Sequence, residues 1–374
     1  MSDSSAPSSK KEQLLALIRA NPFISQQELG ERLGLSRSAV AGHIASLTRE
    51  RRLLGRAYVL PQQAPLVCIG GANLDRKLQS LGPLHLHSSN PARQSETPGG
   101  VARNIAENLA RLGLPTRLLS AFGDDAAGHA LLEQAAQLRI DTRGSLRANG
   151  AATGSYTAVL DADGELMLAL AQMALIEQLT PEFLRLAAPQ RADAALLVAD
   201  LNLGAESIAF LIDEARQHGR PLVLVAVSVP KMERLPHDLS GAQCLILNEA
   251  ELQALVGGQP LKSAATRRRA LGALRARGLR QLVVTAGAAG VYCSSDDETK
   301  DLVHLPAEAV PVRDVSGAGD AFSAGVCASL HRDPQDLTLA CRLGLRLAAL
   351  TLQTEASVIA ELSPALLQDP QDSR

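Results

Sequence analysis

Residues 314–320 carry the residue types that phosphoryl transfer requires. They read Asp-Val-Ser-Gly-Ala-Gly-Asp, so Gly317, Ala318 and Gly319 stand between two carboxylates at the start of a segment that can continue as a helix. Glycines let the backbone turn tightly, and free N–H groups at a helix start then converge on one spot that attracts phosphate. Asp320 can take a proton from an attacking hydroxyl there. Two interpretations stay open: a phosphate-binding turn with a base, or an ordinary Gly-rich turn with flanking acids.

Four further stretches of small and polar residues lie where strands are expected to end, which is where ligands bind in α/β sheets. Each stretch alone is a weak signal, but their order and spacing make the set a strong one. They are Gly70–Asp75, Thr97–Asn104, Asn248–Glu251 and Thr285–Gly290.

The elements that must position these motifs alternate between apolar runs of strand length and helical segments. Strands that are apolar on both faces and separated by helices predict a mostly parallel sheet with helices on both sides. Residues 156–160 and 165–170 instead predict a hairpin that could form part of a lid outside the main sheet. Strands are expected at 66–69, 195–198, 222–227, 244–247 and 281–284, and helices near 101–112, 126–138, 204–217 and 263–278.

Composition narrows the class of protein. The 374 residues are 46% hydrophobic and 20% charged, enough for a real core and about two domains, but only 2% aromatic, which argues against base stacking on an aromatic platform. The net charge of −2 gives no nucleic-acid signal for the whole chain. Five scattered cysteines fit a reducing cytoplasm rather than a disulfide framework or zinc site. No apolar run is long enough to cross a membrane, and no apolar core of the kind expected in a signal sequence follows the polar, Ser-rich residues 1–11.

Residues 10–60 differ from the rest of the chain in charge. They hold nine basic and four acidic residues, a net charge of +5 against −2 for the whole chain, which is the footprint expected of DNA-backbone contacts. Ser25 and Ser36 can cap two short helices separated by Gly34, which matches helix-turn-helix logic. Residues 51–58 are expected to form a wing. A small helical bundle used for dimerisation or docking is the alternative.

This segment resembles the winged helix-turn-helix heads of bacterial transcription regulators, and residues 24–40 carry most of the likeness. The resemblance implies that the third helix enters a groove of double-stranded DNA. The expected DNA-binding residues are Arg37, Ser38, His43 and Arg56. The expected organisation is a disordered tail at 1–9, a winged helix-turn-helix domain at 10–60, a linker at 61–65, a large α/β domain at 66–362 and a C-terminal tail at 363–374.

Residues 66–362 resemble the ribokinase-like (PfkB) family of carbohydrate and nucleoside kinases through the five motifs together. The resemblance implies an α/β fold, a three-layer sandwich with a mostly parallel central sheet and a small β lid. It implies ATP and Mg²⁺ as cofactors, with K⁺ as a further possibility. Asp320 is then the catalytic base, and Gly317, Ala318 and Gly319 form the anion hole.

The same likeness assigns the other motifs. The sugar-hydroxyl pocket matches Asn73, Asp75, Gly99, Gly100 and Asn104. The nucleotide side matches Asn248, Thr285, Gly287 and Gly290. Glu251 matches the acid that orders magnesium and its waters, and Asp314 the position that often supports a monovalent cation.

Within the family, further stretches look most like pseudouridine kinases, among them Ser89–Pro91, Ala171–Met173 and Val198–Asn202. Such an enzyme transfers the ATP γ-phosphate to the 5′-hydroxyl of the nucleoside, and Gln172 and Met173 are where base discrimination is expected. The chain departs from that pattern at Val225-Ala226, where Asp-Pro is usual, at Gln172, which replaces an acid, and at Ser316, which replaces Thr.

Two functions of different classes remain open. One is an active kinase for a nucleoside, ribose or another sugar, fused to a DNA-binding head. The other is a transcription regulator whose kinase-like body is mainly a ligand sensor. Under either function a homodimer is expected, because winged heads usually read two half-sites and family lids often pair between subunits.

Overall fold

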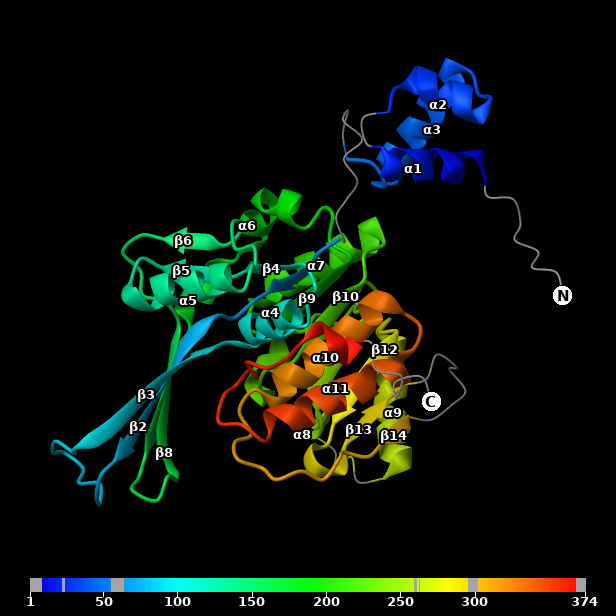
Figure 1. The fold of residues 1–374 in the computed structure, drawn as a ribbon. Coiled ribbons are helices and arrows are strands. Elements are labelled where there is room, and N and C mark those ends of the chain that lie inside the picture. Colours follow the sequence, from blue (N-terminus) through cyan, green and yellow to red (C-terminus); the bar gives the residue numbers. More distant parts are fainter. Residues whose placement is uncertain are drawn as a thin grey trace. The chain divides into compact units, whose positions relative to one another are not determined.

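The computed structural model describes residues 9–21, 24–54, 64–258, 261, 263–294 and 302–367. The chain divides into two compact units, Met1–Ala64 and Pro65–Arg374, each described here by itself (Figure 1).

The N-terminal unit packs three helices around a small apolar core. They are α1 (Lys10–Ala20), α2 (Gln26–Leu33) and α3 (Arg37–Arg49). Ser25 and Ser36 cap α2 and α3 through their hydroxyls, and Gly34 ends α2 with φ 62°, so the predicted helix-turn-helix is confirmed. Ser25 and Glu28 could form a reciprocal capping box, but only the bond from the Glu28 N–H to the Ser25 hydroxyl is present, and the Glu28 carboxylate accepts from Arg32. Arg56, the fourth predicted DNA-binding residue, and the second half of the predicted wing, residues 55–58, lie outside the described residues.

The larger unit is built on an eight-stranded sheet in the order β14-β13-β12-β11-β10-β9-β1-β4. Neighbouring strands from β4 to β12 are parallel, and β13 and β14 pair antiparallel at one edge. The five strands expected from the sequence are all present, within a residue or two at their ends. The bounds are β1 (Leu66–Ile69), β4 (Thr116–Leu119), β9 (Leu196–Asp200), β10 (Leu222–Val225), β11 (Cys244–Asn248), β12 (Gln281–Thr285), β13 (Val291–Cys293) and β14 (Val303–Leu305).

Two helix layers cover this sheet because its strands are apolar on both faces. Leu66 and Cys68 of β1 join one core cluster, which includes α4, α10 and α11, whereas Val67 and Ile69 join the other, with α7 and α9. The predicted three-layer architecture is therefore confirmed. The helices are α4 (Val101–Arg111), α5 (Ala126–Gln137), α6 (Pro181–Leu186), α7 (Ala205–His218), α8 (Glu249–Leu255), α9 (Ala264–Ala276), α10 (Ala318–Arg332) and α11 (Leu337–Thr351), with 3₁₀ turns η1 (Ala174–Gln178), η2 (Ala188–Gln190), η3 (Val229–Arg234), η4 (Gly287–Ala289) and η5 (Pro364–Leu367).

A second, four-stranded sheet extends from the central sheet as a long ribbon (Figure 1). We call it the lid: β3 (Ala92–Gly99), β2 (Asn73–Ser80), β7 (Ser155–Leu160) and β8 (Leu166–Gln172). The predicted hairpin is β7 and β8, whereas β2 and β3 lie where the sequence indicated only turns and a helix start. The short strands β5 (Ala121–Gly123) and β6 (Leu146–Ala148) pair near the lid's base. Among the described residues, no helix is long and apolar enough to cross a membrane.

Candidate active site

The turn that begins α10 has a backbone only glycine can adopt. Gly317 is the N-cap with φ 76°, and a Cβ there would lie 2.0 Å from the Ser357 carbonyl oxygen. At Gly319, in the first turn of α10, a Cβ would meet nothing within 4 Å, so the space beside the backbone is open to a ligand. First-turn N–H groups have no helical partner, and this 15-residue helix presents them together with its positive dipole end. The turn can therefore hold an anion such as phosphate.

Asp320 lies beside this turn and contacts α4 across the fold. Asn104 Nδ2 donates to Asp320 Oδ2 at 2.7 Å, joining residues 216 positions apart. Surrounding protein desolvates the carboxyl and raises its pKa to about 7, the Asn104 hydrogen bond opposes this, and the nearby Asp200 and Asp75 carboxylates add to it. A carboxylate with a pKa near neutrality is matched to proton abstraction from a hydroxyl.

The predicted sugar-pocket residues meet where the lid joins the body. Asn73 and Gly99 face each other across β2 and β3, and Asn73 Nδ2 donates to Asp75 Oδ1 at 2.6 Å. A Cβ on Gly99 would lie 2.2 Å from Asp75 Oδ2, and one on Gly100, which has φ 99°, 2.5 Å from a carbonyl oxygen, so both positions require glycine. Burial raises the pKa of Asp75. These residues offer paired donors and acceptors, as vicinal hydroxyls require.

Asp200, for which the sequence suggested no role, ties three parts of this region together. It ends β9, is 1% exposed, and accepts the backbone N–H groups of Gly71 (2.9 Å), Ala102 (2.8 Å) and Asn202 (2.8 Å). Burial raises its pKa in spite of these hydrogen bonds. Asp200 therefore fixes the turn after β1 and the start of α4, which carries Asn104.

Asp200→Asn should destabilise the protein by about 2–3 kcal/mol, because an amide NH₂ would face a backbone N–H in a site that water cannot reach. Urea unfolding of the purified variant measures this. Asp213→Asn, at an exposed position of α7, is the matched control and should change the free energy of unfolding by less than about 0.5 kcal/mol. A loss as small as the control's would contradict the anchoring role.

The nucleotide-side residues lie at the carboxyl ends of β11 and β12. Asn248 and Glu251 form a capping box at the start of α8: Asn248 Oδ1 accepts from the Glu251 N–H, and Glu251 Oε2 from the Asn248 N–H. The Asn248 NH₂ group therefore remains for a ligand. Thr285 pairs with Asn248 across the strands, and Gly287 and Gly290 have φ of 55° and 97° in the turn that follows.

The donor set at Glu251 fits a magnesium ion held mainly by phosphates and water. Its carboxylate is nearly buried, burial raises its pKa, and the N–H of Asn248 uses one of its oxygens. Mg²⁺ commonly binds through one or two carboxylates, substrate phosphates and water. Val225 and Ala226 supply no acid at the end of β10, and in the described part of the chain no three His, Cys, Asp or Glu side chains gather as a metal cluster.

The residues at Asp314 do not fit an additional monovalent cation. Asp314 Oδ1 accepts the Ser316 N–H at 2.8 Å, and Oδ2 accepts the Lys77 ammonium at 3.0 Å. A lid residue thus already supplies a positive charge to this carboxylate, and we derive no step through K⁺.

The predicted residues divide into three groups. Asp320, its turn, Asn104 and the Asp75 pair form one group. Asn248 and Glu251 at the end of β11 and Thr285 at the end of β12 form a second, two and three strands from β9 at the same edge of the sheet. Arg37, Ser38 and His43 belong to the N-terminal unit. Sequence reasoning missed Asp200, Arg103, Lys77 and Lys231, whose ammonium donates to Asn202 Oδ1.

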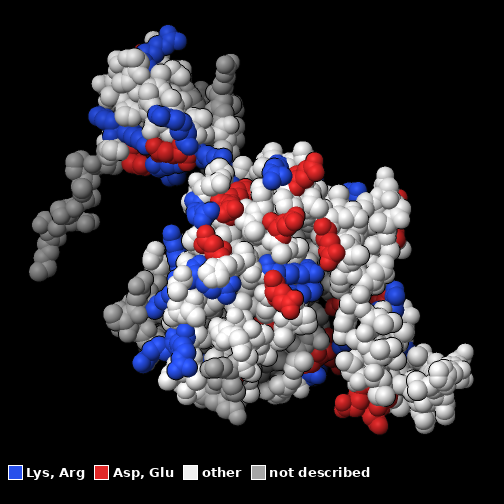
Figure 2. All heavy atoms as spheres, turned by 180° about the vertical axis from the view of Figure 1, so that it is seen from behind, with Lys and Arg blue, Asp and Glu red and all other residues white. Residues whose placement is uncertain are grey.

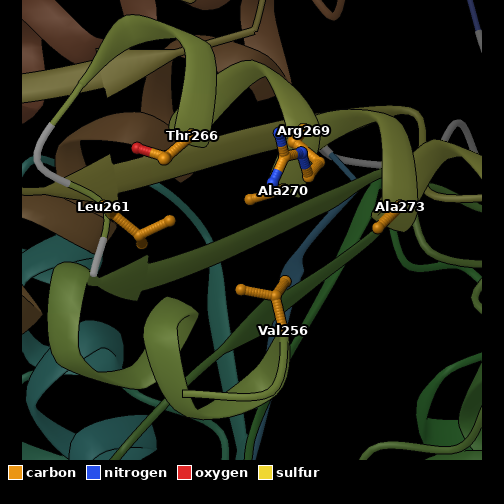
Figure 3. Close-up of a pocket in the computed structure, with 6 residues that line it drawn as sticks. All are labelled: Val256, Leu261, Thr266, Arg269, Ala270 and Ala273. Carbon is orange, nitrogen blue, oxygen red and sulfur yellow. The ribbon is translucent and has the colours of Figure 1, made fainter. Parts of the chain in front are cut away.

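A small open pocket of about 140 Å³ lies between α8 and α9 (Figure 3). Val256, Leu261, Ala270 and Ala273 make its lining mostly apolar, and Thr266 and Arg269 complete it. None of the predicted site residues lines this pocket, and we assign it no function.

Two family profiles match the chain. The profile of the pfkB family carbohydrate kinases covers residues 63–363, and that of winged helix-turn-helix DNA-binding domains covers residues 8–51.

Curated relatives extend these matches. The uncharacterized sugar kinase YeiI of Escherichia coli K12 is 35% identical over 337 residues, 89% of this chain and 92% of that protein. This match is longer than residues 65–374, so it reaches into the N-terminal unit. The pseudouridine kinase of the same organism is 32% identical over 304 residues, 80% of this chain and 94% of that protein.

Among solved structures, the ribokinase of Arabidopsis thaliana, determined with ribose and ATP, matches with a TM-score of 0.71 at 19% identity. The match covers 82% of this chain and 98% of that one. The fold of the larger unit is therefore ribokinase-like.

Proposed function

The chain belongs to the pfkB family of carbohydrate kinases, and from this premise we propose that it transfers the γ-phosphate of ATP to the 5′-hydroxyl of a nucleoside, with pseudouridine as the first candidate. The single observation that supports it most is the desolvated Asp320 carboxylate, held by Asn104 next to the anion-binding turn of α10. Phosphoryl transfer needs positioning, charge neutralisation and a base more than it needs covalent chemistry.

In the proposed mechanism, Asp75 and Asn104 hold the hydroxyls of the acceptor, and Asp320 takes the proton of the attacking hydroxyl. The N–H groups of Gly319 and its neighbours stabilise the charge on the transferring phosphate. Bound magnesium, held through water by Glu251, would neutralise charge on the phosphates. Asn248 and the turn at Gly287–Gly290 lie where the nucleotide would bind.

A nucleoside is favoured over a free sugar because Met173, whose apolar side chain is suited to contact a base, adjoins the sugar pocket. Met173 and Asn73 both approach Gly154, at 3.3 Å and 3.4 Å from the position of a Cβ there. Gln172, the other residue expected to discriminate between bases, lies by strand register on the opposite face of the lid, with Leu168 and Leu170, and lines a separate recess of about 180 Å³.

A coupled assay of ATP consumption over pseudouridine, uridine, other nucleosides and pentoses tests the proposal. We expect turnover with at least one nucleoside and the highest kcat/KM with pseudouridine. Turnover with ribose or another free sugar alone would instead favour a sugar kinase.

A second function, a transcription regulator with a nucleoside-sensing body, is favoured by the basic head and by the missing acid at Val225-Ala226. It predicts that nucleoside changes DNA affinity at fixed salt, and that this response survives Asp320→Asn. A DNA affinity that no nucleoside or sugar alters would eliminate it.

The N-terminal unit is proposed to contact DNA through α3. Arg37 and Ser38 are exposed, His43 is half-buried, and small exposed residues between them allow close approach to a groove. Glu50, Glu28 and Glu12 form ion pairs with Lys11, Arg32 and Arg52, and none of these three basic residues lies in α3. Arg37 and Arg49 of α3 are therefore available for DNA phosphates. Figure 2 shows Lys and Arg side chains gathered on this unit.

Removing both α3 arginines, in Arg37→Ala/Arg49→Ala, should weaken binding to a short mixed-sequence duplex and reduce the slope of log K against log salt by about two. Fluorescence anisotropy over a salt series measures both quantities. Arg342→Ala, at an exposed position of α11, should change neither. An unchanged slope in the α3 variant would show that α3 does not contact phosphates.

The lid is proposed to pair with the lid of a second copy. Leu166, Leu168 and Leu170 of β8 are 57%, 53% and 60% exposed. Strand register places Leu168 and Leu170 on the face opposite Asp75 and Lys77, and Lys77 reaches the body. These leucines therefore face away from the body, on a ribbon that Figure 2 shows to be largely uncharged from behind.

A charge in this leucine row should separate the subunits. Leu168→Asp is expected to convert a dimer to a monomer in sedimentation velocity, because a buried unpaired carboxylate is costly. Leu186→Asp, at a 78% exposed position in α6, is the control and should remain dimeric. A wild-type protein that sediments only as a monomer would contradict the pairing.

A further inference from the structure

Arg103 lies in α4 next to Asn104, and only 7% of its surface is exposed. Its Nη1 donates to Asn104 Oδ1 at 2.7 Å and to the Pro98 carbonyl at 3.2 Å, and its Nη2 donates to Gln134 Oε1 at 3.0 Å and to the Glu107 carboxylate. Arginine is rarely buried this far unless it is paired. These four acceptors fix the guanidinium in one position.

The position of Arg103 determines which way the Asn104 amide points. A guanidinium has donors and no acceptor, so only the carbonyl end of the amide, Oδ1, can face it. The NH₂ end then points the other way, and there Nδ2 donates to Asp320 Oδ2 at 2.7 Å. Arg103, Asn104 and Asp320 thus form a directed series of hydrogen bonds.

Without Arg103, only the hydrogen bond to Asp320 would still oppose a half-turn of the Asn104 amide. Its carbonyl oxygen would then face the Asp320 carboxylate and repel it. In the arrangement observed, one oxygen of Asp320 is held by Asn104, which leaves the other for an acceptor hydroxyl.

The charges around Asp320 add a second effect. The pKa of Asp320 is raised to about 7, chiefly by burial: the Asn104 hydrogen bond lowers it, the Asp200 carboxylate on β9 and the Asp75 carboxylate on β2 raise it, and Arg103 on α4 lowers it. Glu107 pairs with Arg103 and with Arg111. Arg103 therefore acts on Asp320 and Asp75, while Lys77 also acts on Asp75 and Lys231 acts on Asp200.

We propose that Arg103 is a positioning residue for phosphoryl transfer, which orients the Asn104 amide so that Asp320 is held, ionised, toward the acceptor hydroxyl. This rests on the proposed function only in taking Asp320 as the base. No contact between Arg103 and a substrate is required.

Arg103→Gln should lower kcat about tenfold or more, since the base is no longer held in a reactive orientation. It should also move the acid limb of the kcat/KM pH profile upward by about one pH unit, because an opposing positive charge is lost. Arg103→Lys keeps the positive charge but loses the planar guanidinium with its several donors. We therefore expect kcat to fall while the acid limb of the kcat/KM pH profile stays in place. Arg111→Gln, which also loses an ion pair to Glu107 but makes no bond to Asn104, should match the wild type.

A double-mutant cycle with Asn104→Ala separates positioning from general structural damage. If Arg103 acts through Asn104, then Arg103→Gln should have little further effect on kcat in that background. Full additivity, or a wild-type kcat and acid limb in Arg103→Gln, would overturn the proposal. If Arg103→Gln does not fold, the same cycle with Arg103→Lys carries the test.

A carboxyl titration of Asp320 by ¹³C NMR in the wild type and the Arg103 variants requires no turnover. An upward shift of the Asp320 pKa in Arg103→Gln, absent in Arg103→Lys and Arg111→Gln, supports the electrostatic effect even if no nucleoside is phosphorylated. No shift would overturn that effect independently of the substrate.

Discussion

Asp320→Asn is expected to lower kcat for nucleoside phosphorylation by about 10²–10⁴-fold, the range that general-base catalysis contributes. The substitution keeps the shape of the side chain but removes its ability to accept a proton. KM for the nucleoside should change much less, because Asp75 and Asn104, to which the proposed mechanism assigns the acceptor hydroxyls, are not altered. Steady-state kinetics with saturating ATP and magnesium measure both constants.

The pH profile gives a second measure of the same role. Because the pKa of Asp320 is raised to about 7 and only the ionised form accepts a proton, kcat/KM should fall about tenfold per unit below pH 7 and level off above it. Asp320→Asn should abolish this limb. Asp333→Asn, beyond the other end of α10, is the control and should keep both the rate and the limb. A full rate in Asp320→Asn would show that another group is the base.

Gly317→Ala is expected to lower kcat by about 10²–10³-fold, the effect of losing one donor to a developing anion. With φ 76°, the turn disfavours any side chain, and the new Cβ would lie 2.0 Å from the Ser357 carbonyl oxygen, so the backbone must move. The free energy of unfolding should fall by about 3 kcal/mol or more, since strain and a clash with rigid backbone combine.

Gly272→Ala provides the matched control, because this position lies within α9 and a Cβ there meets nothing within 4 Å. It should stabilise the protein by a few tenths to about 1 kcal/mol and leave kcat unchanged. The difference between the two variants measures the effect of changing the α10 turn, apart from the effect of replacing a glycine by alanine. Normal kcat in a folded Gly317→Ala protein would contradict the anion hole.

The sequence predicts the central sheet well because its strands are apolar on both faces. Leu66–Ile69 and Gln281–Thr285, for example, are buried along nearly their whole length, so composition and length identify them. The lid strands β2 and β3 were missed because they are polar or partly exposed. The parallel pairing of β2 with β7 joins segments far apart in the sequence, which no local pattern reveals.

The residues of the candidate site likewise divide into those that a local sequence pattern predicts and those that only the fold reveals. Motifs with glycine, such as the turn at Gly317, carry local geometry that the sequence shows directly. Asp200 and Arg103 could not be assigned a role, because their partners are distant backbone groups or neighbouring side chains whose orientation only the fold defines. The charge of these two residues does not indicate a role in the site, because an acidic residue after a strand and a basic residue in a helix are usually exposed to solvent.

The most direct test of the central claim is a competition assay with equal concentrations of pseudouridine, uridine and ribose, supplied with ATP and magnesium. Product identity and phosphate position, determined by mass spectrometry and ³¹P NMR, give the ratio of kcat/KM values. The proposed function predicts the pseudouridine 5′-phosphate as the main product, formed only when Asp320 is intact. Ribose phosphate as the main product, or no nucleoside phosphate from the folded wild-type protein, would contradict it.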